Sequence, residues 1–221
     1  MFARRRIHGA SGLFLLLILC TRVDAVALFD TFEPHDDYDT RGGLAIGYPE
    51  KGWDQGDRFS FSGTQWYSLD SIELAVALSG GVNALDVWLM SDASGQPGAI
   101  IESFSLVDVM KPFDGMLVPP LTASSTLHPA LAPDTGYWLI ASVPDDDATS
   151  AAWYFNSAGF YGDHALRSMD EPWRVIDDTY GAFRINGTPC DAPVHTPAPG
   201  AFLLGMVGAG LVRRLRQRDA V

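Results

Sequence analysis

Apolar and polar residues alternate along most of this chain, in short runs separated by glycine, proline, asparagine, aspartate and serine. The clearest run covers residues 67–79, where leucine, isoleucine and valine mostly occupy every second position between polar or small residues. A period of two is typical of a β-strand that packs one face on a core. Because no convincing amphipathic helix lies between the two ends of the chain, the pattern predicts an all-β domain.

The same alternation predicts about eight strands with turn-forming residues between them. Strands at this spacing, without helices to cover a parallel sheet, favour an antiparallel β-sandwich of the jelly-roll type. The expected strands cover residues 58–61, 67–79, 85–90, 100–107, 115–121, 137–143, 151–156 and 181–186.

The start of the chain has the plan of a cleaved signal peptide. A cluster of arginines precedes the apolar core at 13–19, and the small residues Ala25 and Ala27 suit a signal peptidase. The alternative is an uncleaved membrane anchor, but the core is well short of the roughly 18 residues that span a bilayer. We therefore expect an N-terminal signal helix over residues 1–27 and export of the remainder.

The end of the chain has a different plan. Residues 192–199 are rich in proline and predict a stiff linker. The apolar run 200–212 would form a helix of about 20 Å, shorter than the hydrocarbon core of about 30 Å. The arginines that follow would stay on the cytoplasmic side and hold the domain outside until processing. The alternative is a core or amphipathic helix of the domain itself.

The chain is thus expected to divide into four parts. The second of them is the folded domain, and the fourth is a short apolar helix that ends in an arginine cluster. The parts are a signal peptide (1–27), the β-sandwich domain (28–191), a Pro-rich linker (192–199) and a C-terminal sorting helix (200–221).

The tail resembles the PEP-CTERM sorting signal of exported bacterial proteins, in which a proline motif precedes an apolar run and an arginine cluster. Ala198 stands where that family usually has Glu. The resemblance implies processing by an exosortase, a membrane protease of bacteria that make exopolysaccharide, after transient anchoring in the inner membrane. The residues that carry it are Pro197, Ala198, Pro199, Arg213, Arg214 and Arg216.

The body of the chain resembles the choice-of-anchor R domain. That resemblance implies an extracellular β domain and no assigned activity. The segments that carry it are residues 67–72, 85–89, 94–98, 101–103 and 131–139.

Charge restricts the partners of the domain. The whole chain has a formal net charge of −12. Residues 1–27 and 200–221 each contain four arginines and one aspartate, a net +3, so the part between them carries −18. Such a surface repels phosphate backbones and disfavours nucleic-acid binding. Without residues 1–27 the chain keeps Cys190 as its single cysteine, so no intramolecular disulfide is expected.

Three consecutive carboxylates are a candidate Ca²⁺ site. Asp145, Asp146 and Asp147 would repel one another without a cation, and Ca²⁺ prefers oxygen ligands. The alternative is a solvated loop on an acidic surface. No other cofactor is expected.

No motif in the chain indicates catalysis. The tripeptide 134–136, Asp-Thr-Gly, matches that of aspartic proteases, but one copy cannot supply the paired carboxylates, and a turn explains it. The histidines lack metal-ligand spacing, and no G-x-S-x-G elbow marks a nucleophile. We therefore expect a protein that is not an enzyme, with a structural or adhesive role at the cell surface or in the extracellular matrix.

Aromatic residues in the last third of the chain suggest an alternative role. Exposed rings beside polar groups are typical of sugar-binding β domains, whereas alternation would send many of these rings into the core. The candidates for a ligand contact are Tyr154, Tyr161 and Trp173. The alternative function is a carbohydrate-binding module that recognises exopolysaccharide, and a hydrolase is the third.

Overall fold

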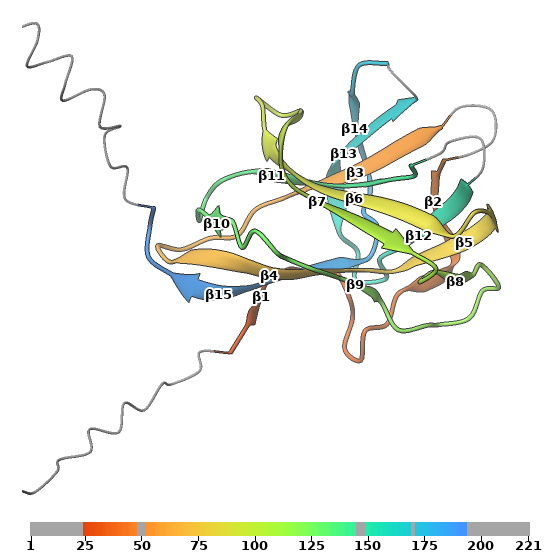
Figure 1. Ribbon diagram of the computed structural model, residues 1–221, viewed down its shortest axis with the longest axis horizontal. Coiled ribbons are helices and arrows are strands. Elements are labelled where there is room, and N and C mark those ends of the chain that lie inside the picture. Colours follow the sequence, from red (N-terminus) through yellow and green to blue (C-terminus); the bar gives the residue numbers. More distant parts are fainter. Residues whose placement is uncertain (1–23, 48–51, 145–148, 169–170, 194–221) are drawn as a thin grey trace, which may run out of the picture.

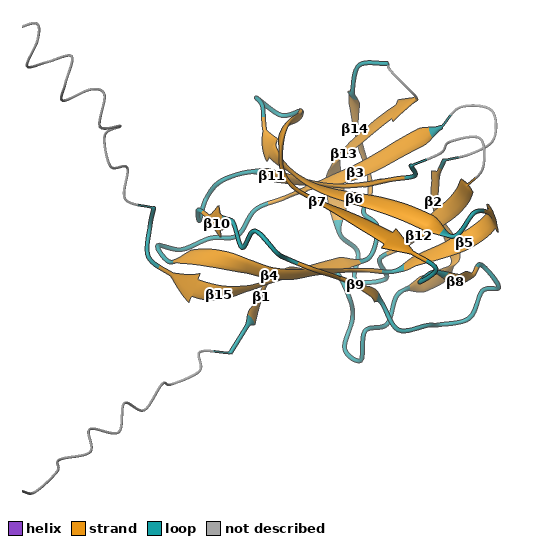
Figure 2. Cartoon of the chain, viewed as in Figure 1, coloured by secondary structure: helices purple, strands orange, loops and turns teal. Residues whose placement is uncertain are grey.

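The fold is all-β throughout the part of the chain that the structure describes. These residues form fifteen strands and no helix, as Figure 2 shows. All strand pairs but one are antiparallel, which confirms the predicted fold class. The computed structural model describes residues 24–47, 52–144, 149–168 and 171–193.

The strands form three sheets. A five-stranded sheet contains β1 (Val26–Asp30), β15 (Phe183–Cys190), β4 (Trp66–Leu74), β9 (Leu121–Ser124) and β10 (Ala130–Leu131). A six-stranded sheet has the order β14 (Arg174–Thr179), β13 (Tyr161–Ser168), β3 (Trp53–Phe59), β11 (Tyr137–Ser142), β6 (Ala84–Asp92) and β7 (Pro97–Val107). A four-stranded sheet has the order β2 (Asp39–Ile46), β12 (Thr149–Phe155), β5 (Val76–Gly81) and β8 (Lys111–Pro112), of which β5 and β8 are parallel.

The hydrophobic core lies between the six-stranded sheet and the other two sheets. Alternate residues of β6, Leu85, Val87 and Leu89, are fully buried on one face of the six-stranded sheet. They belong to one cluster with Ile72 of β4 and Trp153 of β12, which face them from the other two sheets. Figure 1 shows β3, β6 and β11 above β4 and β15, with β2, β5 and β12 at one end. The period of two therefore builds a sandwich.

Residues 67–79, predicted as one strand, form β4 and β5 in different sheets. The crossing point is Ala75, whose N–H donates to Ala182 O (3.0 Å) and whose carbonyl accepts from the Tyr154 N–H (2.9 Å). Leu74 and Val76 on either side are both buried in the core. Because the residues around the crossing are all buried, the apolar pattern does not reveal the change of sheet.

Other strand predictions were wrong or missing. Residues 115–120 are loop and only Leu121 of the predicted strand 115–121 lies in β9, because Pro119 and Pro120 lack the N–H of a sheet ladder. The pattern also missed β1, β2, β8, β10, β13 and β14. In β2 the apolar period is broken by glycine, and a Cβ on Gly43 would lie 2.5 Å from Trp153 O. Gly43 therefore lies too close to the backbone of β12 to carry a side chain. For this reason β2 lacks an apolar residue that could have marked it as a strand in the sequence.

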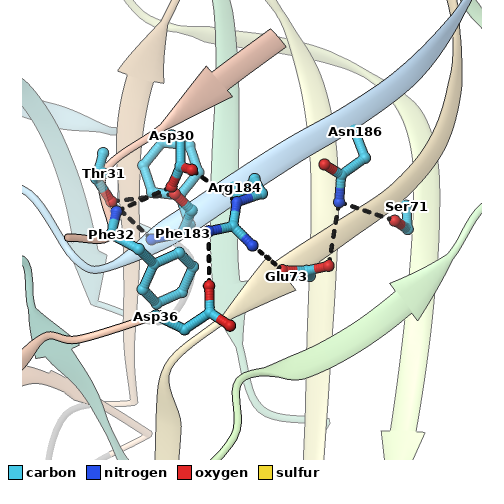
Figure 3. A network of polar contacts seen from close by, with 9 residues as sticks. All are labelled: Asp30, Thr31, Phe32, Asp36, Ser71, Glu73, Phe183, Arg184 and Asn186. Atoms are coloured by element: carbon cyan, nitrogen blue, oxygen red, sulfur yellow. Dashed lines mark hydrogen bonds and ion pairs between the residues drawn. The ribbon is translucent and has the colours of Figure 1, made fainter. Parts of the chain in front are cut away.

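Arg184 of β15 joins the start of the domain to the five-stranded sheet (Figure 3). Its guanidinium donates to the carboxylates of Asp30, Asp36 and Glu73 at 2.7, 2.7 and 2.8 Å. Its guanidinium carbon lies 5.2 Å from the centre of the Phe32 ring. Because these partners come from β1, the segment that follows it and β4, one planar side chain fixes three segments.

Several predictions fall outside the described residues. β1 begins at Val26, so the last two residues of the predicted signal peptide, Val26 and Ala27, pair with β15. The described part of the chain contains no helix long and apolar enough to cross a membrane. The remaining predictions outside it concern residues 1–23, the two terminal helices, the calcium candidates Asp145, Asp146 and Asp147, and the sorting residues Pro197, Ala198, Pro199, Arg213, Arg214 and Arg216.

Candidate binding site

A hollow of about 250 Å³ opens where β3 ends and β13 begins. The antiparallel register pairs Asp57 with His164, which places Arg58 beside Asp163 at its edge. Aromatic rings form most of the remaining wall. We name it the Arg58 hollow, and its lining residues are Phe29, Arg58, Phe59, Ser60, Phe160, Tyr161, Asp163 and Tyr180.

The Arg58 guanidinium is held from several sides. Its Nε donates to Asp92 Oδ1 (3.0 Å), and its Nη1 donates to Asp163 Oδ2 (3.2 Å). The indole N–H of Trp138 donates to the same Asp92 oxygen at 2.9 Å. A Cβ on Gly136 would lie 2.8 Å from Nη2, so the guanidinium packs closely on glycine backbone. These contacts pre-organise a cation at the edge of the hollow.

Asp92 stays ionised beside this cation. Burial alone would raise the pKa of Asp92, but hydrogen bonds from Gly95, Trp138 and Arg58 together outweigh it and lower the pKa. With Asp163 on the other side, two carboxylates flank one guanidinium. The charged edge of the hollow therefore has a net negative charge.

Tyr180 keeps its proton in the wall of the hollow. Burial raises the pKa of Tyr180, and the carboxylates of Asp57 and Asp163 raise it further, while Arg58 opposes them. A neutral phenol both donates and accepts a hydrogen bond. The hollow thus combines a fixed cation, a carboxylate and a hydroxyl with aromatic walls.

Tyr161, a predicted ligand aromatic, lies at the rim of the hollow. Its side chain is 66% exposed, and its hydroxyl donates to Asp177 O at 3.2 Å. Phe160 beside it packs edge-on against Phe29, with ring centres 5.6 Å apart. The Tyr161 ring therefore presents an open face next to fixed polar groups, which is the arrangement expected of a ligand contact.

Trp173, the second predicted ligand aromatic, lies elsewhere, on the outer face of the six-stranded sheet. The guanidinium carbon of Arg167 lies 4.4 Å from the Trp173 ring centre and 5.7 Å from that of Trp88. Arg167 is anchored through Nε by the buried carboxylate of Asp54, which also accepts from Ser142. Trp173 is half-buried, and its packing against a cation accounts for it without a ligand.

The prediction that Tyr154, the third candidate aromatic, contacts a ligand was wrong. The side chain is fully buried between the rings of Tyr38 and Phe113, at centre distances of 5.2 and 5.1 Å. Burial also raises the pKa of its phenol. The alternation in β12 sends Trp153 into the main core and Tyr154 into a second cluster on the opposite face, so neither side of the strand is open here.

His164 and Asp57 form a buried pair of the kind seen in catalytic triads. His164 Nδ1 lies 2.7 Å from Asp57 Oδ1, but its Nε2 lies 2.8 Å from Gln55 Oε1. The nitrogen that would take a proton from a nucleophile is thus occupied by an amide oxygen. The side chains of His164 and Asp57 are almost completely inaccessible to solvent, so this pair stabilises the fold and cannot contact a substrate.

The remaining candidates for chemistry lie in loops. Asp134 has a positive φ of 53° and its N–H donates to Phe61 O, so the Asp-Thr-Gly tripeptide forms a turn, as the sequence predicts. Among the described residues, no group of three or more His, Cys, Asp or Glu is placed to hold a metal ion.

Of the residues that line the hollow, Tyr161 is predicted from the sequence as a possible ligand aromatic, and the polar ones are not. The pattern predicts a strand over residues 58–61, which includes Arg58 and Ser60, and gives no ligand role to them or to Asp163. Their proximity depends on the pairing of β3 with β13, which are more than one hundred residues apart. A weak signal was present in the alternation of Tyr161, Asp163 and Ala165 in β13.

No family model and no curated protein matches the chain. Among solved structures, the chain is similar to the cysteine protease and lectin-like domains of Cwp84, a surface layer associated protein of Clostridium difficile. The identity is 13% and the TM-score 0.38, and the match covers 62% of this chain and 32% of that chain. This chain therefore spans about a third of the Cwp84 chain, and so distant a likeness assigns no function.

Proposed function

We propose that this chain is an exported bacterial surface or extracellular-matrix protein with an adhesive or structural role. Its β-sandwich binds a neutral glycan in the Arg58 hollow and performs no catalysis. The signal-like start and the PEP-CTERM-like tail support export and processing by an exosortase, with the tail in the membrane before cleavage. The acidic domain between them suits this location because its charge favours solubility.

The observation that carries the binding role is the exposed Tyr161 ring beside Arg58 and Asp163. A sugar ring has an apolar C–H face and an edge of hydroxyls. The first suits an aromatic surface, and the second suits a guanidinium and a carboxylate that are already held in place. The hydroxyl of Tyr180 adds a further donor in the wall.

The charge of the hollow favours a neutral glycan over an anionic one. Arg58 is outnumbered by Asp92 and Asp163, which both bind it. A uronate or sulfate group would therefore meet a negative potential in addition to the repulsion of the whole domain. Hydroxyl groups carry no such penalty.

The test is retardation of the full chain in native gels that contain dextran, mixed-linkage β-glucan or galactomannan. Tyr161→Ala removes the exposed ring and should weaken binding to the retarding polysaccharide by about tenfold or more, as truncation of an aromatic anchor does. Leu127→Ala is the matched control, because Leu127 is 68% exposed and lies outside the hollow. Equal retardation of the two variants, or no retardation by any neutral polysaccharide, would contradict the proposal.

A further inference from the structure

The Arg58 hollow is small, and one of its walls is apolar. Its volume of about 250 Å³ is below the range of about 300–1,000 Å³ that is typical of pockets for drug-sized ligands. It therefore takes a single sugar unit and not a stretch of polymer. In the apolar wall Phe29 is half-buried and Phe160 is 37% exposed, and their rings meet edge-on. Such a wall gains from contact with an apolar group of the ligand.

Tyr180 brings an unused hydroxyl group to this hollow. Tyr180 is 8% exposed, and its hydroxyl forms no hydrogen bond within the part of the chain that the structure describes. The hydroxyl oxygen lies against the β13 backbone between Tyr161 and Asp163, because a Cβ on Gly162 would lie 2.9 Å from it. A buried hydroxyl without a partner costs free energy, which a ligand group that bonds to it recovers.

Asn156 holds the apolar wall and Tyr180 in fixed positions. It is buried, and its side-chain amide donates to Phe160 O (3.0 Å) and Tyr180 O (2.8 Å). Its Oδ1 accepts from the Phe160 N–H at 2.8 Å, and the Tyr180 N–H donates to Phe160 O at 3.2 Å. The backbones that carry the Phe160 ring and the Tyr180 phenol are thus joined before any ligand arrives, which lowers the entropic cost of binding.

We infer that the Arg58 hollow selects a sugar unit that carries an acetamido group. This inference rests on the proposed glycan binding and names the class of sugar. An acetamido group presents a methyl group, a carbonyl oxygen and an N–H close together. The methyl group suits the wall of Phe29 and Phe160. The carbonyl oxygen accepts from the Tyr180 hydroxyl, and the N–H donates to the Asp163 carboxylate, whose side chain is 41% exposed.

Other substituents of a sugar fit the hollow less well. A carboxylate would be repelled by Asp92 and Asp163, which flank Arg58. An ammonium group would be attracted by them, but it is strongly hydrated and offers no apolar surface to the wall. A hydroxyl group bonds to a polar residue of the hollow but likewise offers no apolar surface. The acetamido group alone among these four is uncharged and partly apolar.

The test is saturation-transfer NMR on the full chain, in a mild detergent without sugar groups that shields the apolar tail. The probes are N-acetylglucosamine and N-acetylgalactosamine, and glucose and galactose are the matched sugars without the acetamido group. The acetyl methyl protons should receive more saturation than the ring protons, because they contact the aromatic wall. Titration should give a Kd for at least one acetamido sugar that is lower by about tenfold or more than that of its parent sugar.

Tyr180→Phe keeps the buried ring and removes only the hydroxyl that the acetamido carbonyl would bond to. It should raise the Kd for the acetamido sugar by about fivefold. Tyr67→Phe is the matched control, because it removes a hydroxyl from a half-buried tyrosine outside the hollow and should leave the Kd unchanged.

The outcomes separate this inference from the glycan binding on which it rests. Parent sugars that bind as tightly as the acetamido sugars would overturn the inference and leave glycan binding in place. The same holds if neutral polysaccharides retard the chain but neither acetamido sugar binds, or if Tyr180→Phe leaves the Kd unchanged. If none of the four sugars binds and no neutral polysaccharide retards the chain, both proposals are wrong.

Discussion

At the scale of single residues, His164 and Asp57 form a buried pair on whose hydrogen bonds the fold depends. Both ring nitrogens face oxygen atoms, Asp57 Oδ1 and Gln55 Oε1, and the Gln55 amide is oriented by its own bond to Ala45 O (2.7 Å). Both side chains are thus held by hydrogen bonds in the interior, where they are almost completely inaccessible to water.

Replacing His164 by Leu should be strongly destabilising. The Asp57 carboxyl group would remain fully buried, with the Gly181 N–H (2.8 Å) as its remaining hydrogen-bond donor. Breaking one side of a buried pair costs about 3–5 kcal/mol, whereas replacing both partners by apolar groups costs less. Urea unfolding should therefore show a larger loss of unfolding free energy for His164→Leu than for the double variant His164→Leu/Asp57→Leu. The reverse order would show that the pair is not coupled.

The loss in His164→Leu should also depend on pH. Burial raises the pKa of Asp57, and the bond to His164 opposes this effect in the native chain. A carboxyl group with a raised folded pKa contributes stability below its unfolded pKa of about 3.9 and loses it as the pH rises. The deficit of His164→Leu relative to the native chain should thus be smaller near pH 4.5 than near pH 7.5. A deficit that is constant over this range would contradict the assignment.

At the scale of elements, Glu102 clamps β7 to the segment between β9 and β10. Its carboxylate accepts from Ser125 Oγ (2.7 Å), Thr126 N (2.8 Å) and Leu127 N (3.0 Å). Burial alone would raise the pKa of Glu102, but these hydrogen bonds together outweigh it and lower the pKa. One carboxylate thereby connects the six-stranded sheet to the five-stranded sheet across the open side of the sandwich.

Glu102→Gln should weaken this clamp and change how the stability of the fold depends on pH below neutrality. An amide has one acceptor oxygen where the carboxylate has two, so at least one donor loses its partner, at a cost of about 1–3 kcal/mol. A lowered folded pKa gives stability above the unfolded pKa of about 4.3 that is lost as the pH falls. Thermal unfolding from pH 7 to pH 3 should therefore show a large difference between variant and native chain at pH 7 that shrinks on acidification.

The control for this clamp is Glu33→Gln, which changes the same charge on an exposed side chain. It should reproduce neither the loss at pH 7 nor its decrease in acid. If the two variants behave alike, the hydrogen bonds of Glu102 have no net effect on stability.

Strands rich in buried apolar residues could be predicted from the sequence, and those that depend on long-range pairing could not. The predictions at 85–90, 137–143 and 151–156 overlap β6, β11 and β12, whose apolar residues belong to buried clusters on both faces of their sheets. β13 escaped prediction because it has few apolar residues, and its place in the sheet depends on pairing with β3 and β14. The same reason hid the polar part of the Arg58 hollow, since Arg58 and Asp163 become neighbours only when β3 and β13 pair.

At the scale of the whole molecule, the contacts that hold the first strand lie after the predicted signal peptide. Phe29 stacks on Phe183 with ring centres 5.2 Å apart, and Asp30 binds Arg184 at 2.7 Å. Val26 and Ala27, in contrast, add only the end of the ladder with β15. Cleavage after Ala27 would therefore leave the domain with the contacts that anchor its first strand.

The intact mass of the protein exported by a bacterial host checks this expectation at both ends. We expect a chain that starts at Leu28 and lacks the arginines from Arg213 onward, because the signal peptide and the sorting tail are both removed. A start at Val26 would keep β1 whole and would move the cleavage site without affecting the domain. An exported form that retains residues 213–221 would contradict processing of the tail. The variant Ala198→Glu, which introduces the residue usual in PEP-CTERM signals, would then show whether Ala198 prevents the cleavage. If the Glu variant is also retained intact, the tail is not a sorting signal.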